Sequence, residues 1–187
     1  MKKILKIFVF IFISEVSFFA VPAMSAQQVK MFGVPLSDAT RATLGQALIK
    51  AGFKPVRITE HLKYNKYNVT KKQFKGAYLL DVGYTYGGRF AIAEYFLYTT
   101  DLGGHGSDTV AVIKDKYGNP SFVHIGMSNS VYIWKERDGI EIVLHLGFLS
   151  SNLKLINIPE YRLRLKQIKK ITFKKNKAVE KSESNAF

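Results

Sequence analysis

A pattern that occurs twice along the chain places the strongest limit on how it can fold. At residues 35–55 and again at 106–120, Ser-Asp precedes apolar residues at helical spacing, then a glycine and a nearby proline. Strand-like segments follow each copy. An amphipathic helix and an antiparallel sheet with one apolar face must both bury that face. We therefore expect an α+β fold in which helices cover one face of a single antiparallel sheet.

The repeat predicts one domain over residues 27–173, built from two tandem units of one helix and three strands. The units span about 33–100 and 101–158. Ser37 and Ser107 are expected to cap the two helices, because serine accepts hydrogen bonds from the first backbone N–H groups of a helix. The Gly87-Gly88 and Asp138-Gly139 pairs each predict a tight hairpin turn.

The C-terminal part predicts one more helix and then a tail. Pro159 suits the first turn of a helix over about 159–172. Residues 174–187 are too polar to bury a face and are expected to be disordered. From Arg162 to Lys177 the chain has eight Lys or Arg and no acid, which accounts for more than half of the net charge of +14. This segment is either a solvated basic tail or a contact for anionic lipid or lipopolysaccharide, and its candidate residues are Lys169, Lys170, Lys174 and Lys175.

The first 25 residues resemble a signal peptide. Lysines at positions 2, 3 and 6 precede the apolar run 7–13, and Ala23-x-Ser25 fits a cleavage site. We expect an exported protein, periplasmic or secreted. Export argues against nucleic acid as a partner and against chemistry driven by nucleoside triphosphates. The chain contains no cysteine, which excludes disulfides, thiolate metal sites and a cysteine nucleophile.

A helix that opens with Ser-Asp and ends in Tyr117-Gly-Asn-Pro120, followed by a three-stranded meander, resembles the repeat of the β-lactamase-inhibitor-protein-like fold. The small lipoprotein of the outer-membrane β-barrel assembly machinery (SmpA/OmlA) carries one comparable unit, although this chain lacks a cysteine for lipidation. Residues 33–52 also look like the opening of a group of small exported bacterial proteins with no assigned activity. The resemblance implies a binding module rather than a catalyst, and no functional residue carries over from it.

Two groups of residues are candidates for a site. Gly104, His105, Gly106 and Ser107 form a glycine-rich loop that leads into a helix, where backbone N–H groups can hold an anion. The serine beside a histidine also suggests a nucleophile with its base, and the alternative to both is an ordinary helix cap. Aromatic residues on the predicted Gly87-Gly88 hairpin are either core or a partner surface. Those singled out as contacts are Tyr84, Tyr86 and Tyr98.

Other titratable residues predict no catalytic, metal or cofactor site. The four histidines lack the spacing of metal ligands. Asp81 and Glu94 face each other across the predicted hairpin, either as an acid–base pair or, as we favour, with basic partners or solvent. The leading hypothesis is an exported non-enzymatic protein that binds another exported or envelope protein, as an inhibitor, immunity factor or assembly accessory. The alternatives are a secreted hydrolase centred on Gly103–Asp108 and an anionic-envelope binder acting through the basic C-terminus.

Overall fold

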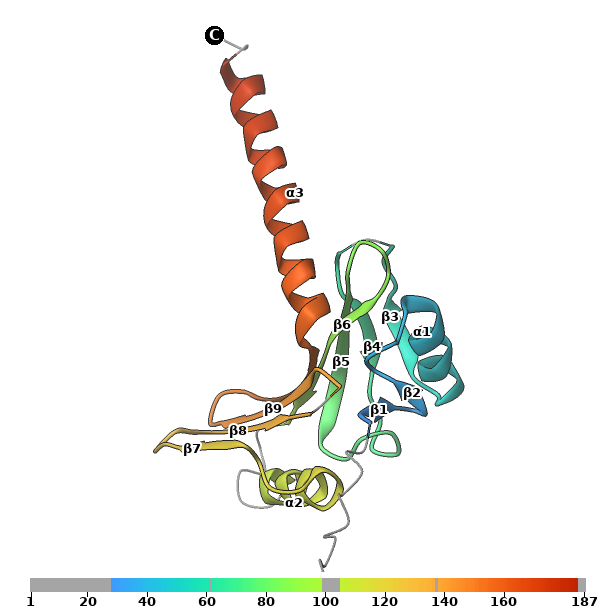
Figure 1. The fold of residues 1–187 in the computed structure, drawn as a ribbon, viewed down its shortest axis with the longest axis vertical. Coiled ribbons are helices and arrows are strands. Elements are labelled where there is room, and N and C mark those ends of the chain that lie inside the picture. Colours follow the sequence, from blue (N-terminus) through green and yellow to red (C-terminus); the bar gives the residue numbers. More distant parts are fainter. Residues whose placement is uncertain (1–27, 61, 99–104, 137, 185–187) are drawn as a thin grey trace, which may run out of the picture.

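The computed structural model describes residues 28–60, 62–98, 105–136 and 138–184, and all structural statements below concern these residues. Three helices and ten strands follow one another along the chain (Figure 1). They are β1 (Lys30–Met31), β2 (Val34–Pro35), α1 (Arg41–Lys50), β3 (Lys54–Arg57), β4 (Asn65–Asn68), β5 (Ala77–Tyr84), β6 (Phe90–Leu97), α2 (His105–Tyr117), β7 (Phe122–Ile125), β8 (Asn129–Lys135), β9 (Ile140–Gly147), β10 (Ser151–Asn157) and α3 (Ile158–Ser184).

One antiparallel sheet of eight strands, in the order β3-β4-β5-β6-β10-β9-β8-β7, organises the fold. The first four strands and the last four meet where β6 pairs with β10, with Tyr95 opposite Leu153. The expected α+β class, with a large antiparallel sheet and a C-terminal helix, is confirmed. Four strands follow each of α1 and α2, one more than the predicted unit; the last of them, β10, has its own alternating pattern of burial and lies between β6 and β9. That the two halves arose by duplication stays a prediction.

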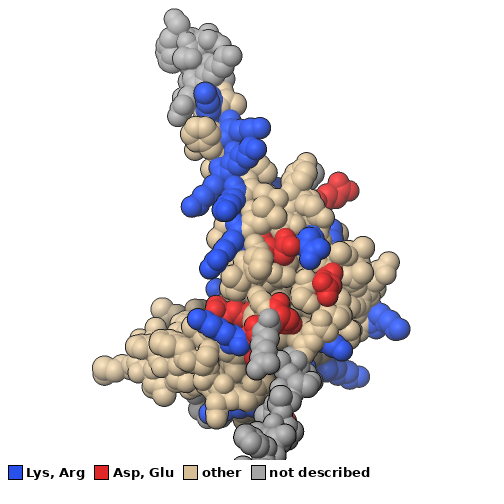
Figure 2. Space-filling model, viewed as in Figure 1, with Lys and Arg blue, Asp and Glu red and all other residues tan. Residues whose placement is uncertain are grey.

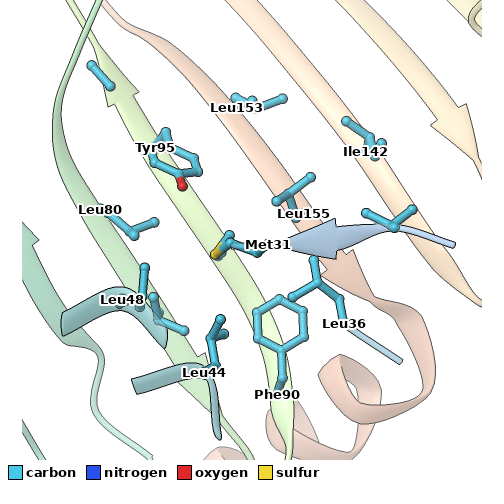
Figure 3. Close-up of a cluster of buried hydrophobic side chains, with 14 of the residues drawn as sticks. Met31, Leu36, Leu44, Leu48, Leu80, Phe90, Tyr95, Ile142, Leu153 and Leu155 are labelled. Carbon is cyan, nitrogen blue, oxygen red and sulfur yellow. The ribbon is translucent and has the colours of Figure 1, made fainter. Parts of the chain in front are cut away.

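The core lies on the sheet face that α1 and α2 cover. Leu44 and Leu48 of α1 point toward Leu80 on the sheet, and the apolar row continues across the junction of the halves (Figure 3). At the far end, the indole N–H of Trp134 donates to the carbonyl oxygen of Gly118 at 2.9 Å, which ties the end of α2 to β8. The predicted apolar faces are therefore buried together, as the amphipathic patterns require.

The starts of both repeat helices differ from the prediction. Thr40, not Ser37, caps α1: its hydroxyl accepts from the Thr43 backbone N–H at 3.2 Å, and the Thr43 hydroxyl accepts from the Thr40 N–H. The preceding turn buries Leu36 and Ala39, so the chain cannot become helical at Ser37 without withdrawing them from the core. The helix α2 likewise begins at His105, which places Ser107 inside the first turn rather than at the cap.

The third helix packs on the opposite face of the sheet, against β5, β6 and β10. Its anchor is Arg164, which is 3% exposed; the guanidinium lies 4.4 Å from the centre of the Tyr64 ring and donates to the carbonyl oxygen of Leu62. Beyond this contact α3 projects away from the sheet (Figure 1). In the described part of the chain, no helix combines the length and apolarity needed to cross a membrane.

The end of α3 corrects a prediction. The helix was expected to stop near residue 172 with disorder from 174, whereas the structure continues it to Ser184. After Pro159 this segment contains neither glycine nor proline, and lysine, glutamate, glutamine and alanine all favour helix. Polarity alone therefore predicted the wrong state for residues 174–184.

Candidate functional site

The sheet ends in a region without charge, which we call the uncharged end. It comprises residues 121–134 and 142–153, which contain no Lys, Arg, Asp or Glu, although 22% of the whole chain is charged. In Figure 2 the lobe that carries β7 and β8 shows this lack of charge on its visible side. Its large exposed apolar side chains are Phe122, Val123, Ile125, Met127, Phe148 and Leu149. Several large exposed apolar side chains in one uncharged region of a protein often mark an interaction site.

Two neighbouring loops build the tip of the uncharged end. The backbone N–H of Phe148, after β9, donates to the carbonyl oxygen of Ser128, before β8, at 3.1 Å. Met127 and Leu149, which are 109% and 89% exposed, are therefore carried by adjoining loops. Neither loop contains a charged residue that would keep an apolar partner away.

An open groove of about 640 Å³ lies between α2 and the uncharged end. Its helix side is formed by Val110, Ala111 and Lys114, and its sheet side includes Tyr132 and Leu146. The remaining lining residues are Gly126, Met127, Ser128, Asn129, Ser130 and Phe148. The groove is thus mostly apolar, with a single cationic side chain from α2, and it opens beside the exposed tip.

The strand β7 forms the outer edge of the uncharged end, with no strand beyond it among the described residues. The N–H of Gly126 donates to the carbonyl oxygen of Asn129, at the β8 end of the hairpin. Alternate residues of an antiparallel strand bond the same neighbour. His124 and Phe122 therefore bond β8, and the N–H and C=O groups of Val123 and Ile125 point away from the sheet. These groups can pair with an added strand.

The opposite edge of the sheet is protected against such pairing. The edge strand β3 reads Lys-Pro-Val-Arg, so two of its four residues are charged, and Pro55 has no N–H to donate. By contrast, β7 reads Phe-Val-His-Ile, with no proline and no acidic, lysine or arginine side chain. The two edges of one sheet are thus chemically different, and β7 is the edge suited to accept a partner.

The prediction that Tyr84 contacts a partner is wrong, because its side chain is buried. It is 0% exposed, the Arg41 guanidinium lies 4.6 Å from the centre of its ring, and burial raises its pKa. Tyr86 and Tyr98 are exposed, at 63% and 56%, but they lie at opposite ends of the β5–β6 hairpin. Tyr98 packs on Tyr78 with ring centres 5.0 Å apart, whereas the Tyr86 backbone N–H donates to a side chain of α3. The structure therefore does not bring the three together.

The predicted glycine-loop site is described only in part. Gly104 lies outside the described residues, as do the side chains of His105 and Ser107; the backbone of residues 105–107 forms the first turn of α2. The carboxylate of Asp108, in the same turn, lies 3.8 Å from the Lys75 ammonium. The anion-binding and hydrolase hypotheses for this loop stay predictions.

The predicted basic residues Lys169, Lys170, Lys174 and Lys175 are all exposed on α3. Lysine and arginine side chains gather along this helix as it leaves the sheet (Figure 2). The helix points away from the uncharged end (Figure 1), so the structure separates a basic surface from an apolar one.

The facing carboxylates of the β5–β6 hairpin each have their own cation. Lys66 lies 2.6 Å from Asp81, and Lys154 lies 3.3 Å from Glu94, in a row that crosses β4, β5, β6 and β10. These ion pairs support the interpretation that Asp81 and Glu94 have basic partners, and not that they act as an acid–base pair. In the described residues, no three His, Asp or Glu side chains gather as metal ligands would.

The chain was compared with protein-family models, curated proteins and solved structures, and one solved structure is similar to it. No protein-family model matches the chain, and no curated protein matches it. Among solved structures, it is similar to a DUF4309 family protein (YjgB) from Bacillus subtilis, with 14% identity and a TM-score of 0.43 over 69% of this chain and 86% of that one. A likeness at this level carries no argument about function. The resemblance to β-lactamase-inhibitor-like repeats is not tested by these comparisons.

Proposed function

We propose that this is an exported, non-enzymatic binding protein that holds an extended apolar segment of another protein at the uncharged end. Export rests on the signal-peptide pattern of residues 1–25. The observation that carries the binding function is the contrast between the two sheet edges, since β3 is protected and β7 is open and uncharged. An inhibitor, an immunity factor or an assembly accessory would each work through such a contact.

The partner's chemistry follows from the groups that β7 presents. Outward N–H and C=O groups at Val123 and Ile125 supply backbone hydrogen bonds to an added strand, and such bonds supply affinity without side-chain specificity. Side chains on alternate positions of that strand would face the exposed tip and the groove beside α2. A segment with apolar residues at alternate positions and few charges fits this surface.

The test is a substitution that changes the edge without changing the ladder. In Val123→Pro the outward N–H is lost, while the bonds of His124 and Phe122 to β8 remain, because proline is tolerated where the N–H of an edge strand faces solvent. Val123→Thr is the matched control, since it alters the same side chain and keeps the N–H. Both variants and the parent protein serve as bait for an envelope extract, with thermal unfolding as the check on folding.

We expect the parent and Val123→Thr to retain one partner in stoichiometric amount and Val123→Pro to lose it. Equal retention by a folded Val123→Pro protein would show that the edge is not used. Sedimentation of the purified protein tests whether β7 instead pairs with a second copy of the same chain. If the parent protein is a dimer and Val123→Pro is a monomer, the edge serves self-association and not a foreign partner. Substrate turnover that Ser107→Ala abolishes would overturn the non-enzymatic assignment.

A further inference from the structure

The part of α3 that projects from the sheet carries a second interaction surface, independent of the uncharged end. Successive residues of a helix are turned by about 100°, so positions 163, 166, 170, 173 and 177 fall within about a quarter of the circumference. We call these residues the outward face of α3. They are Leu163, Lys166, Lys170, Phe173 and Lys177, and all five are exposed.

The outward face lies on the side of α3 that is turned away from the folded domain. On the opposite side, Arg164 is buried against the sheet. Between the two sides, the side-chain oxygen of Gln167 accepts from the Tyr86 N–H at 2.8 Å. Ile168, on the same side as Arg164, is half-buried. A flat surface could therefore approach the outward face without meeting the sheet.

The charge on this face has no acidic counterpart between Arg162 and Lys177, and Glu180 is the first acid after it. The last acid before it, Glu160, already lies 2.7 Å from Arg89. Lys169 and Lys174 flank the outward face and add to the same field, whereas Lys175 lies almost opposite it on the helix. A surface of negative charge is the electrostatic complement of such a helix.

Two large apolar side chains stand among the lysines. Leu163 is 44% exposed and Phe173 is 70% exposed, and ten residues of helix separate them by about 15 Å. Lysine stems can lie along an apolar layer while their ammonium groups stay at its polar boundary. Basic residues interleaved with Leu and Phe are typical of helices that lie in the interface of an anionic bilayer.

We infer that α3 lies on an anionic phospholipid bilayer through its outward face, with Leu163 and Phe173 inserted among the lipid chains. An anionic polymer such as nucleic acid would satisfy the lysines but would leave these two exposed apolar side chains without a role. The bilayer uses both properties of the face. The folded domain then sits on the water side of the helix, with the uncharged end available to a different partner.

The test measures binding to vesicles by flotation, with a chain that begins at Gln28, so that the apolar residues 1–27 contribute nothing. The vesicles contain phosphatidylglycerol and phosphatidylcholine in equal parts, or phosphatidylcholine alone, at 25 mM and 500 mM salt. The charge variant is Lys166→Glu/Lys170→Glu/Lys177→Glu. Its matched control, Lys54→Glu/Lys71→Glu/Lys72→Glu, makes the same change in net charge at exposed lysines of the first half. The insertion variant is Leu163→Ser/Phe173→Ser.

We expect binding to the anionic vesicles only, weakened by salt because screening shortens from about 20 Å to about 4 Å over this range. The charge variant should bind about 100-fold more weakly or worse, since each lysine near an anionic surface contributes roughly a fivefold gain. The control should stay within about threefold of the parent. The insertion variant should bind about tenfold more weakly or worse.

Several results would overturn the inference. Equal binding of the parent to both kinds of vesicle, or an equal loss in the charge variant and its control, would remove the specific role of α3. Unchanged binding by the insertion variant would reduce the contact to electrostatic adsorption without Leu163 and Phe173. If the protein binds a DNA duplex more tightly than the anionic vesicles, and the charge variant loses this binding, the ligand of α3 would be an anionic polymer and not a bilayer. Melting temperatures equal to that of the parent confirm that the variants are folded.

Discussion

Gly83 tests how α3 is held on the sheet. This glycine lies in β5, under the contact between the sheet and α3. A methyl group at its Cα would come within 2.9 Å of Ile92 Cγ2 and of Tyr64 Cε1, and within 3.0 Å of Arg164 Nε. Alanine in a strand normally gains about 0.5–1 kcal/mol over glycine, because glycine loses more backbone entropy on folding. Overpacking a filled site costs about 1–3 kcal/mol, so Gly83→Ala should destabilise by about 1–2 kcal/mol.

Gly45 in α1 provides the matched control. Its added methyl group would meet one atom, the Tyr67 hydroxyl, at 4.0 Å. Gly45→Ala should therefore stabilise by about 1 kcal/mol, the usual difference between the two residues inside a helix. Urea unfolding followed by the fluorescence of Trp134, the single tryptophan and 1% exposed, measures both changes. Trypsin should also cleave α3 faster in Gly83→Ala. A Gly83→Ala protein at least as stable as the parent would refute the close packing of α3 on β5.

Three further predictions follow from buried polar groups. The Tyr84 hydroxyl is buried with no hydrogen-bond partner among the described residues, so Tyr84→Phe should raise the free energy of unfolding by about 1 kcal/mol at pH 7, measured in urea. Burial raises the pKa of Tyr84 and of Tyr95, so above about pH 10 the unfolded chain binds fewer protons than the folded one. Stability should therefore hold below pH 10 and fall above it by up to about 1.4 kcal/mol per pH unit for each of these tyrosines, and the double phenylalanine variant should lose both contributions. Lys66→Met leaves the buried Asp81 beside a second carboxylate without its cation and should cost about 3 kcal/mol, whereas Lys154→Met should cost less because that pair is more exposed; equal losses in thermal melts would contradict this order.

Local signals in the sequence predicted turns and helix ends well, because glycine conformation is a local property. Gly88 and Gly139 both have a φ near +80° in the predicted hairpins, and Gly52 and Gly118 have the same conformation just after α1 and α2. Side chains with a Cβ rarely adopt this conformation, so the glycines fixed these positions without reference to the rest of the fold.

Helix starts and buried faces depended on contacts that the sequence does not display. Ser37 and Thr40 are both good caps, and burial of the turn between them selects Thr40. Tyr84 and Tyr86 read alike in the alternating pattern, but β5 ends at Tyr84, which is buried, and Tyr86 lies in the turn beyond it, where it is exposed. The absence of charged residues over 121–134 can be seen in the sequence alone. Only the topology shows that this stretch forms an outer edge.

The pairing of β6 with β10 has a consequence for how the chain is made. β6 (Phe90–Leu97) precedes β10 (Ser151–Asn157) by some fifty residues, so it is available first when the chain emerges into the compartment where it folds. During that interval β6 is the terminal strand of a half sheet, it carries one charge, Glu94, and its inner neighbours are already in place. Such an edge pairs readily with other unfinished chains. The yield of native protein should therefore depend on how quickly residues 98–157 follow, and a pause while they emerge would favour aggregation through β6.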